Sequence, residues 1–359
     1  MKEKFKALAK PAAAILISLA LGTLILLLAG YDVQKSFLAL WHATFKDLRS
    51  FAGTVNKSSP LLFTALAVAI SFRGNVFNIG AEGQLLMGAV GATVVGTTFT
   101  GLPGPVLIFL MILAGAVGGA LCAYIPGLLK AKYDVSEVIT TIMFNYIALQ
   151  FVGYLVRGPL RDVKQAEPIS FTIAKQGFLP SLIPGTKLHL GFLLGCVIAA
   201  FLFFLLFKNY IGYEIRAVGF NKNAANVAGI NVRSTVIGTM LLSGAIAGVG
   251  GAIELANVHY LLQGISPGYG YTAIAVAILA SSNPIGVIFS SLLFGGLSAG
   301  ASAMQREAGV SASFVQIFQG IIIVAVALAA VQRRAAERKK GGGNESNTEK
   351  AKEEVGLNA

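Results

Sequence analysis

The sequence predicts an all-α polytopic membrane protein of about ten transmembrane helices. Of its 359 residues, 55% are hydrophobic and only 12% are charged, whereas a soluble domain carries about 25% charged residues. The mean hydropathy is +0.73, and Asp, Glu, Lys and Arg are concentrated between long apolar runs rather than scattered through them. This composition excludes a soluble globular domain.

The apolar runs set the number of spans. A hydrocarbon core about 30 Å thick requires about 20 apolar residues per helix, or fewer where neighbouring helices allow a break. The second and eighth runs are short, ending at Asn75 and at Ser281-Ser282-Asn283-Pro284, so we expect a broken short helix in the bundle. We place the ten spans near residues 11–29, 60–73, 78–100, 104–125, 136–156, 189–207, 235–256, 270–281, 285–303 and 314–331.

The first run resembles a secretory signal, because it follows four lysines within residues 1–10. It contains 19 uninterrupted apolar residues. Signal-peptide cores are shorter, with about 7–15 residues. We therefore expect the first run to be a retained membrane anchor.

Basic residues predict the direction in which the chain crosses the membrane. With the N-terminus inside, 18 of the 28 Lys and Arg fall in cytoplasmic segments and 10 fall outside. Because cytoplasmic loops are enriched in basic residues, this asymmetry favours two cytoplasmic termini and accounts for the net charge of +12. We expect a cytoplasmic N-terminus at 1–10, a transmembrane domain at 11–331 and a disordered cytoplasmic tail at 332–359, which is polar and has no apolar pattern.

Small residues predict close packing of the helices. Three pairs of glycines are spaced four residues apart within apolar runs, which allows helix backbones to approach each other in lipid. Dimerisation is the alternative use of such pairs, but in a bundle of ten spans we expect internal packing. The pairs are Gly115 with Gly119, Gly244 with Gly248, and Gly296 with Gly300.

Polar residues at membrane depth are candidates for function, because each is costly in lipid and requires a partner or a wet cavity. The segment 72–84, FRGNVFNIGAEGQ, is the strongest, because its glycines allow a break in the helix and its amides can line a polar path. Its candidate residues are Asn75, Asn78, Glu82 and Gln84. Glu82 has an alternative role as the partner of Arg73 in a structural lock.

Three further clusters of polar residues lie in the apolar runs. Glu137, Thr141 and Asn145 follow one another at intervals of four, which places them on one face of a helix. Glu254 stands alone near the end of an apolar helix, and Tyr269 and Tyr271 belong to a bent segment rich in Gly and Pro. For any one residue, an interhelical hydrogen bond is an equal alternative; four clusters together favour a hydrophilic pathway.

The segment 208–234 interrupts two long apolar spans on the predicted cytoplasmic side. Its central part, 212–230, reads GYEIRAVGFNKNAANVAGI, in which charged residues alternate with Ala and Gly at helix-packing spacing. The pattern predicts a short helix, a glycine break and another short helix that dock a soluble partner. A solvated connecting loop is the alternative.

Several chemical motifs are absent from the sequence. No phosphate-binding loop occurs, because the chain contains no Gly-Lys dipeptide, and there is no catalytic triad spacing or zinc motif. The two cysteines and three histidines are widely separated and form no ligand pattern. We therefore expect no enzyme activity, metal or cofactor in this chain. If ATP drives transport, the ATPase must be another polypeptide.

Four stretches of the sequence resemble a known family, and together the resemblance covers nearly all of residues 10–331. The chain resembles the permease subunits of bacterial ABC importers of the branched-chain amino acid, ribose and nucleoside type, with the nucleoside (guanosine-type) branch the most similar. The stretches are SFRGNVFNIGAEGQLLMGA (Ser71–Ala89), EVITTIMFNYIAL (Glu137–Leu149), GYEIRAVGFNKNAANVAGI (Gly212–Ile230) and YGYTAIAVAILASSNPIGVIFSSLLFGGL (Tyr269–Leu297). One departure is Ala280–Asn283, which stands where relatives often have a glycine-rich turn.

The resemblance implies a function and a set of partners. It implies a multi-pass permease of the bacterial cytoplasmic membrane that moves nucleosides and works with an ABC ATPase subunit, a sister permease and a lipid-anchored binding protein. ATP and Mg²⁺ would be held by the ATPase. In that family 208–234 is the coupling segment that docks on the ATPase, a role that passes by resemblance to Glu214, Arg216, Gly219, Asn221, Ala225 and Gly229.

Two alternative functions stay open at this stage. A sugar or amino-acid ABC permease differs only in its cargo. An ion-coupled secondary transporter would instead use Glu82, Glu137 or Glu254 and would need no partner.

Overall fold

The structure is a computed structural model that describes residues 20, 22–24, 26–183, 185–186, 188–311, 314, 317, 320–321 and 324. The chain divides into two compact units, one made of residues 1–33 with 311–359 and the other of residues 34–310. In the first unit, the Tyr31 and Phe314 rings lie 5.8 Å apart. All the helices discussed below belong, apart from Val33, to the second unit.

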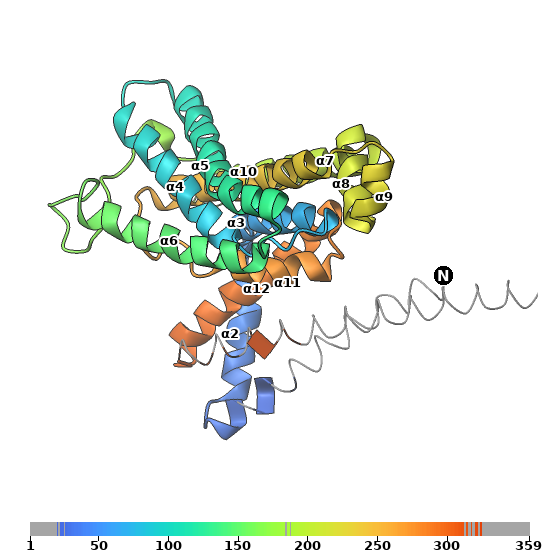
Figure 1. Ribbon diagram of the computed structural model, residues 1–359. Helices are drawn as coiled ribbons and strands as arrows, with labels where there is room; N and C mark the ends of the chain where they lie inside the picture. Colours follow the sequence, from blue (N-terminus) through green and yellow to red (C-terminus); the bar gives the residue numbers. More distant parts are fainter. Residues whose placement is uncertain are drawn as a thin grey trace, which may run out of the picture. The chain divides into compact units, whose positions relative to one another are not determined.

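The second unit is built from helices, and β-structure among the described residues is limited to isolated bridges. The first five helices precede the long segment 158–190, and the remainder follow it (Figure 1). The elements are α2 (Val33–Phe45), α3 (Leu48–Arg73), α4 (Ala81–Thr98), α5 (Gly104–Tyr133), α6 (Glu137–Arg157), η1 (Lys175–Gly177), α7 (Gly191–Lys208), α8 (Tyr210–Phe220), α9 (Lys222–Val227), α10 (Val232–Val258), α11 (Tyr269–Leu279) and α12 (Pro284–Glu307).

Six described helices are long and apolar enough to cross a membrane: α3, α5, α6, α7, α10 and α12. The all-helical prediction is confirmed, whereas the count of ten is not. Two of the ten predicted spans, 11–29 and 314–331, fall mostly outside the described residues, as do the termini 1–10 and 332–359. The described residues within the two spans are helical, apart from Ala29, which lies in a turn.

Of the two short predicted spans, one is longer in the structure and the other is short as expected. The short span 60–73 is the second half of the 26-residue helix α3, which passes through Pro60 without ending. Polar residues such as Asn56 and Lys57 in its first half hide its true length from a hydropathy pattern. The eighth segment is a helix of only 11 residues, α11, as its short apolar run indicates.

The core of the unit is the packing of α4, α5 and α10 on one another. A Cβ added at Gly119 would clash with the backbone oxygen of Gly244, and one added at Gly248 would clash with that of Gly115. A Cβ added at Gly88 of α4 would likewise clash with the backbone of Gly248. The predicted packing role is confirmed for the pairs Gly115–Gly119 and Gly244–Gly248, because only glycine allows these backbones to touch. In the third pair, Gly300 packs closely on Leu40 of α2, whereas a Cβ at Gly296 would have room.

The bundle is interrupted where α3 gives way to α4. Asn75 has a φ of 53°, a left-handed conformation that asparagine tolerates better than most residues. Residues 74–80 then run without helical structure before α4 begins at Ala81. The predicted break is confirmed, and its backbone groups require partners from neighbouring helices.

Candidate functional site

The broken connection 74–80, one face of α6 and the first turn of α11 meet inside the second unit. We call this region the polar junction. It is built from three separate stretches of the chain that the sequence singled out: 72–84, 137–145 and 268–271. The structure therefore brings most of the predicted pathway residues together.

The polar face of α6 holds the backbone of the broken connection. Glu137 Oε1 accepts a hydrogen bond from Phe77 N at 3.3 Å, and Thr141 Oγ1 accepts one from Ile79 N at 3.3 Å. Asn145 accepts from Gly83 N at 2.8 Å and donates to the Ile79 oxygen at 2.9 Å. The stripe at intervals of four is confirmed, and its side chains satisfy backbone groups that the helix break leaves free.

A second set of hydrogen bonds ties the connection to α10. Asn78 Nδ2 donates to Ser243 Oγ at 2.8 Å, and the Ser243 hydroxyl donates in turn to the Ala67 oxygen of α3 at 2.6 Å. The Asn78 and Gln84 amides bond each other through both pairs of atoms, each at 3.0 Å. These side chains are fully buried with paired amides, which makes them part of the fold.

The sequence suggested that Glu82 and Arg73 pair with each other, but the structure gives each of them other partners. Glu82 Oε2 accepts from Gly270 N at 2.7 Å and so caps the first turn of α11. Arg73 donates to the carbonyl oxygens of Ser281 and Ser282, at 3.1 and 2.9 Å. Both serines have φ values near 50° (52° and 53°), a left-handed conformation that favours glycine.

The predicted pathway residues differ in their exposure. Asn75 is exposed and Tyr271 is 44% exposed, with its hydroxyl 3.4 Å from Asn145 Nδ2. Tyr269 is buried beside them in the first turn of α11. Glu254 lies near the far end of α10, where it bonds Asn257 and interacts electrostatically with Tyr269 of the junction.

The coupling segment 208–234 contains two short helices, as predicted, but the break between them is at Asn221 rather than at a glycine, since Gly219 lies within α8. Asn221 caps α9 by accepting from Asn223 N and Ala224 N, and Gly229 ends it with a φ of 85°. Ala225 belongs to a buried apolar cluster with Val218 and Met240. Of the six predicted docking residues, these three shape the segment.

The other three predicted docking residues also have packing roles. Gly219 allows α8 to touch the end of α3, since a Cβ there would clash with the Arg73 backbone oxygen. Arg216 lies over the Phe207 ring at 5.4 Å and donates to the Gly212 oxygen at 3.3 Å. Glu214 is half-buried on α8.

Sequence reasoning missed the most exposed part of the coupling segment. Phe220, at the end of α8, is 89% exposed, and Val227, at the end of α9, is 90% exposed. Figure 1 shows both helices together at one end of the unit. An isolated apolar residue in a polar stretch gives little signal in sequence.

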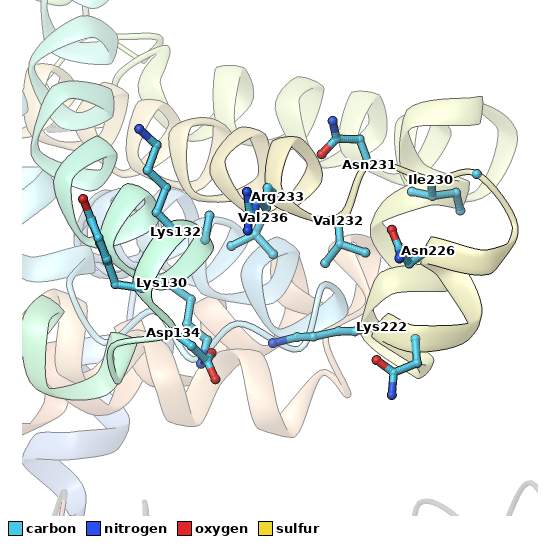
Figure 2. A pocket seen from close by; sticks show the side chains of 14 residues that line it. Lys130, Lys132, Asp134, Lys222, Asn226, Ile230, Asn231, Val232, Arg233 and Val236 are labelled. Carbon is cyan, nitrogen blue, oxygen red and sulfur yellow. The ribbon is translucent and has the colours of Figure 1, made fainter.

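A cleft of about 1030 Å³ lies between the end of α5 and the start of α10, with α9 along its side (Figure 2). Lys130 bonds Asp134 at 2.8 Å and Glu137 at 3.1 Å, which joins the cleft to the polar junction. Lys222 of α9 extends toward Asp134 in the same view. The hydrogen bond from Lys130, with the added charge of Lys222, lowers the pKa of Asp134.

Comparisons with known proteins agree with this architecture. Residues 50–327 match the family model described as branched-chain amino acid transport system / permease component. The guanosine ABC transporter permease protein NupP of Bacillus subtilis is 39% identical over 331 residues, covering 91% of this chain and 95% of that protein. The nucleoside ABC transporter permease protein NupB of Lactococcus lactis is 31% identical, covering 91% of this chain and 93% of that protein.

A third relative has a different cargo in its name. The glucose ABC transporter permease protein TsgB13 of Haloferax volcanii is 32% identical, covering 88% of this chain and 85% of that protein. No solved structure matches the chain. The extent of the family match and of these relatives shows that the chain belongs to the permease components of ABC transport systems.

Proposed function

We propose that this protein is the permease subunit of an ABC importer that moves nucleosides across the bacterial cytoplasmic membrane. The observation that carries the proposal is its 39% identity to a guanosine permease over nearly the full length of both chains. A second relative of similar coverage is named for nucleosides. Membership of an ABC permease family also argues against the ion-coupled alternative.

The proposed topology has ten spans with both termini in the cytoplasm. Six are the candidate spans of the second unit, α4 and α11 are two more, and the apolar segments 11–29 and 314–331 complete the count. The orientation is supported by the excess of basic residues in the segments that it places inside.

The ATPase docks, in this proposal, on the exposed tips of the coupling segment. Phe220 and Val227 supply the apolar contact, while Gly219, Asn221 and Gly229 give the segment its shape. Desolvated apolar residues at the centre of an interface contribute most of its binding energy. The half-buried Glu214 and Arg216 lie beside this contact and supply charge at its rim.

Two sets of contacts link the docking surface to the polar junction. In one, Lys222 faces Asp134, which bonds Lys130, and Lys130 bonds Glu137. In the other, Gly219 packs on the end of α3. There Arg73 holds the turn between α11 and α12. Movement of α8 and α9 on the ATPase would shift α3 and α11 together.

The cargo path runs along the exposed side of the junction. Tyr271 and Asn75 are the members that a passing nucleoside would touch. The other predicted pathway residues of the junction are buried, and they position the connection and the start of α11. They are Asn78, Glu82, Gln84, Glu137, Thr141, Asn145 and Tyr269. A nucleoside is neutral and rich in hydrogen-bonding groups, so a tyrosine hydroxyl and an amide suit it better than a fixed charge.

The importer requires further subunits. ATP and Mg²⁺ would be held by the ABC ATPase, so this chain needs no cofactor and performs no catalysis. A sister permease is supported by pairs of relatives from single organisms: NupP with NupQ in Bacillus subtilis, and NupB with NupC in Lactococcus lactis. A lipid-anchored binding protein would deliver the cargo.

A simple sugar is the second candidate cargo, favoured by the glucose permease of Haloferax volcanii. The test is uptake of radiolabelled guanosine, glucose and leucine in a strain that lacks this gene, with and without a plasmid copy. We expect the deletion to abolish the ATP-dependent uptake of guanosine alone. Guanosine uptake that the deletion leaves unchanged would contradict the proposal, and loss of glucose uptake instead would assign the sugar.

A further inference from the structure

A cavity of about 500 Å³ lies far from the coupling segment. Its walls include the last turn of α10, Asn56 of α3 and part of the segment 158–190. Because α10 starts beside the coupling segment and has 27 residues, at about 1.5 Å per residue its last turn lies about 40 Å away. In the proposed orientation this end faces the outside of the cell.

We propose that this cavity is an entry subsite that receives a neutral nucleoside before it reaches the polar junction. The inference deepens the proposed function and rests on it for the class of cargo. It stands on three observations: two unpaired buried polar atoms in residues that line the cavity, an uncharged lining, and side chains held in place behind it.

The first unpaired atom belongs to His189, which lines the cavity and is only 5% exposed. Its Nδ1 accepts a hydrogen bond from Gly191 N at 3.0 Å. A neutral imidazole that accepts at Nδ1 carries its proton on Nε2, and burial lowers the pKa of His189 to about 4. The Nε2–H group is thus a donor, and it has no partner among the described residues.

The second unpaired atom is an acceptor in Asn56, another residue that lines the cavity. Asn56 donates through Nδ2 to Asn257 Oδ1 at 3.2 Å, while its own Oδ1 has no partner in the described part of the chain. Asn257 is held by Glu254 from behind. This arrangement fixes the Asn56 amide, so the residues that line the cavity carry one unpaired buried donor and one unpaired buried acceptor. The lactam edge of a purine base offers the complementary pair.

The described residues of the lining carry no charged side chain. The ten described residues of the wall include no Asp, Glu, Lys or Arg. An amino acid brings a carboxylate and an ammonium group, which require charged or many polar partners when they lose water. The wall also includes Tyr260 and the edge of a stacked ring pair, His259 on Phe178, with centroids 3.7 Å apart. Aromatic rings suit a planar base.

Backbone hydrogen bonds hold the chain around the cavity in place. Ile173 N donates to the His259 oxygen at 2.9 Å, and Ser170 N donates to the Leu261 oxygen at 2.9 Å. These bonds join the segment 158–190 to the end of α10 and the connection that follows it. A volume of about 500 Å³ falls within the range of about 300–1,000 Å³ that is usual for small-molecule sites.

The test distinguishes the roles of the two ring nitrogens of His189. Asparagine reproduces the acceptor near Nδ1 and removes the donor at Nε2, whereas glutamine keeps a donor near Nε2 and removes the acceptor. We would purify the assembled transporter in nanodiscs, without the binding protein, and measure the Kd of tritiated guanosine per folded complex. Because one hydrogen bond to a neutral ligand is lost, His189→Asn should raise Kd by about 3- to 10-fold relative to wild type and to His189→Gln.

Ser59→Ala provides a matched control. Ser59 is buried on α3 with an unpaired hydroxyl, like Asn56, but it does not line the cavity. The Kd for guanosine should not change in this variant.

Equal Kd values for His189→Asn and His189→Gln, whether unchanged or both raised, would overturn the subsite, because the histidine would then serve only to cap α7. Wild-type complex that takes up guanosine but shows no binding would also overturn it and leave the proposed function standing. Loss of both uptake and binding in the wild type would contradict the proposed function and the subsite together.

Discussion

The polar junction and the coupling segment assign opposite roles to polar and apolar residues. In the junction, buried polar side chains such as Asn145 and Asn78 satisfy a broken backbone, so they maintain the fold. In the coupling segment, polar residues such as Asn221 cap helices, and the exposed tips are the apolar Phe220 and Val227. A polar residue in a membrane protein is therefore not by itself evidence of a binding surface.

The physical reason is the environment of each region. A free backbone group inside the membrane has no water to bond, so the first task of a nearby side chain is to satisfy it. At the end of the bundle, water satisfies the backbone, and an exposed apolar side chain gains only when a partner covers it.

The close approach of α8 to α3 should be the most sensitive point. Gly219→Leu forces a side chain into the backbone of Arg73, so α8 must move away from α3. We expect uptake to fall to background and the ATPase to be lost on purification. Gly238→Ala is the matched control, because a Cβ there meets nothing within 4 Å, and it should keep wild-type uptake.

The exposed side chains of Phe220 and Val227 should contribute most of the binding energy between the permease and the ATPase. Phe220→Ala with Val227→Ala removes two side chains that are about 90% exposed (89% and 90%), so the permease should fold normally. If they are interface hot spots, the amount of ATPase that co-purifies should fall by at least about tenfold. Val163→Ala, an exposed apolar residue in the segment 158–190, is the control. Normal co-purification of the double variant would show that the tips are not the docking surface.

Asn145→Leu should lower the amount of folded protein rather than the activity of each molecule. It leaves Gly83 N and the Ile79 oxygen without partners, at a cost of roughly 1–3 kcal/mol for each buried group. We expect abundance in the membrane to fall several-fold and uptake to fall in proportion. Full abundance with reduced uptake would instead assign Asn145 to the cargo path.

Tyr271→Phe should instead lower the activity of each folded molecule and leave the amount of folded protein unchanged. Tyr271 is partly exposed, and its hydroxyl makes only a long 3.4 Å contact with Asn145, so stability should not change. If the hydroxyl touches the cargo, uptake per folded protein should fall by about 2- to 5-fold. Uptake equal to wild type would remove Tyr271 from the path.

The ion pairs of the cleft should contribute least to uptake. Asp134 is exposed, so Asp134→Asn should reduce uptake by less than about twofold. Because the pKa of Asp134 is lowered, the carboxylate stays charged as pH falls until the pH reaches that lowered pKa. Its contribution should therefore be constant between pH 6 and 8. Loss of most activity in Asp134→Asn would show that this link transmits the movement.

Much of the architecture follows from the sequence, for identifiable reasons. The glycine pairs of α5 and α10, the break after Arg73 and the stripe Glu137–Thr141–Asn145 depend on spacing within short stretches, and each is confirmed. The length of α3 was underestimated, since Asn56 and Lys57 are polar in the sequence but lie within the helix.

The partners of polar residues could not be predicted, because they come from distant parts of the chain. Glu82 bonds Gly270, which is 188 positions away, and the sequence offered the nearer Arg73 as its partner. The unpaired nitrogen of His189 is visible only once Gly191 is known to occupy the other nitrogen. Candidate residues can be chosen from sequence, but their roles depend on the contacts they make.

The most direct test of the contrast is guanosine uptake normalised to folded transporter, measured side by side in Asn145→Leu and in the Phe220→Ala, Val227→Ala double variant. The account predicts near-normal uptake per folded molecule for Asn145→Leu, with low abundance. It predicts a large loss per folded molecule for the double variant, with normal abundance. The opposite pattern would contradict the assignment of the junction to the fold and of the apolar tips to coupling.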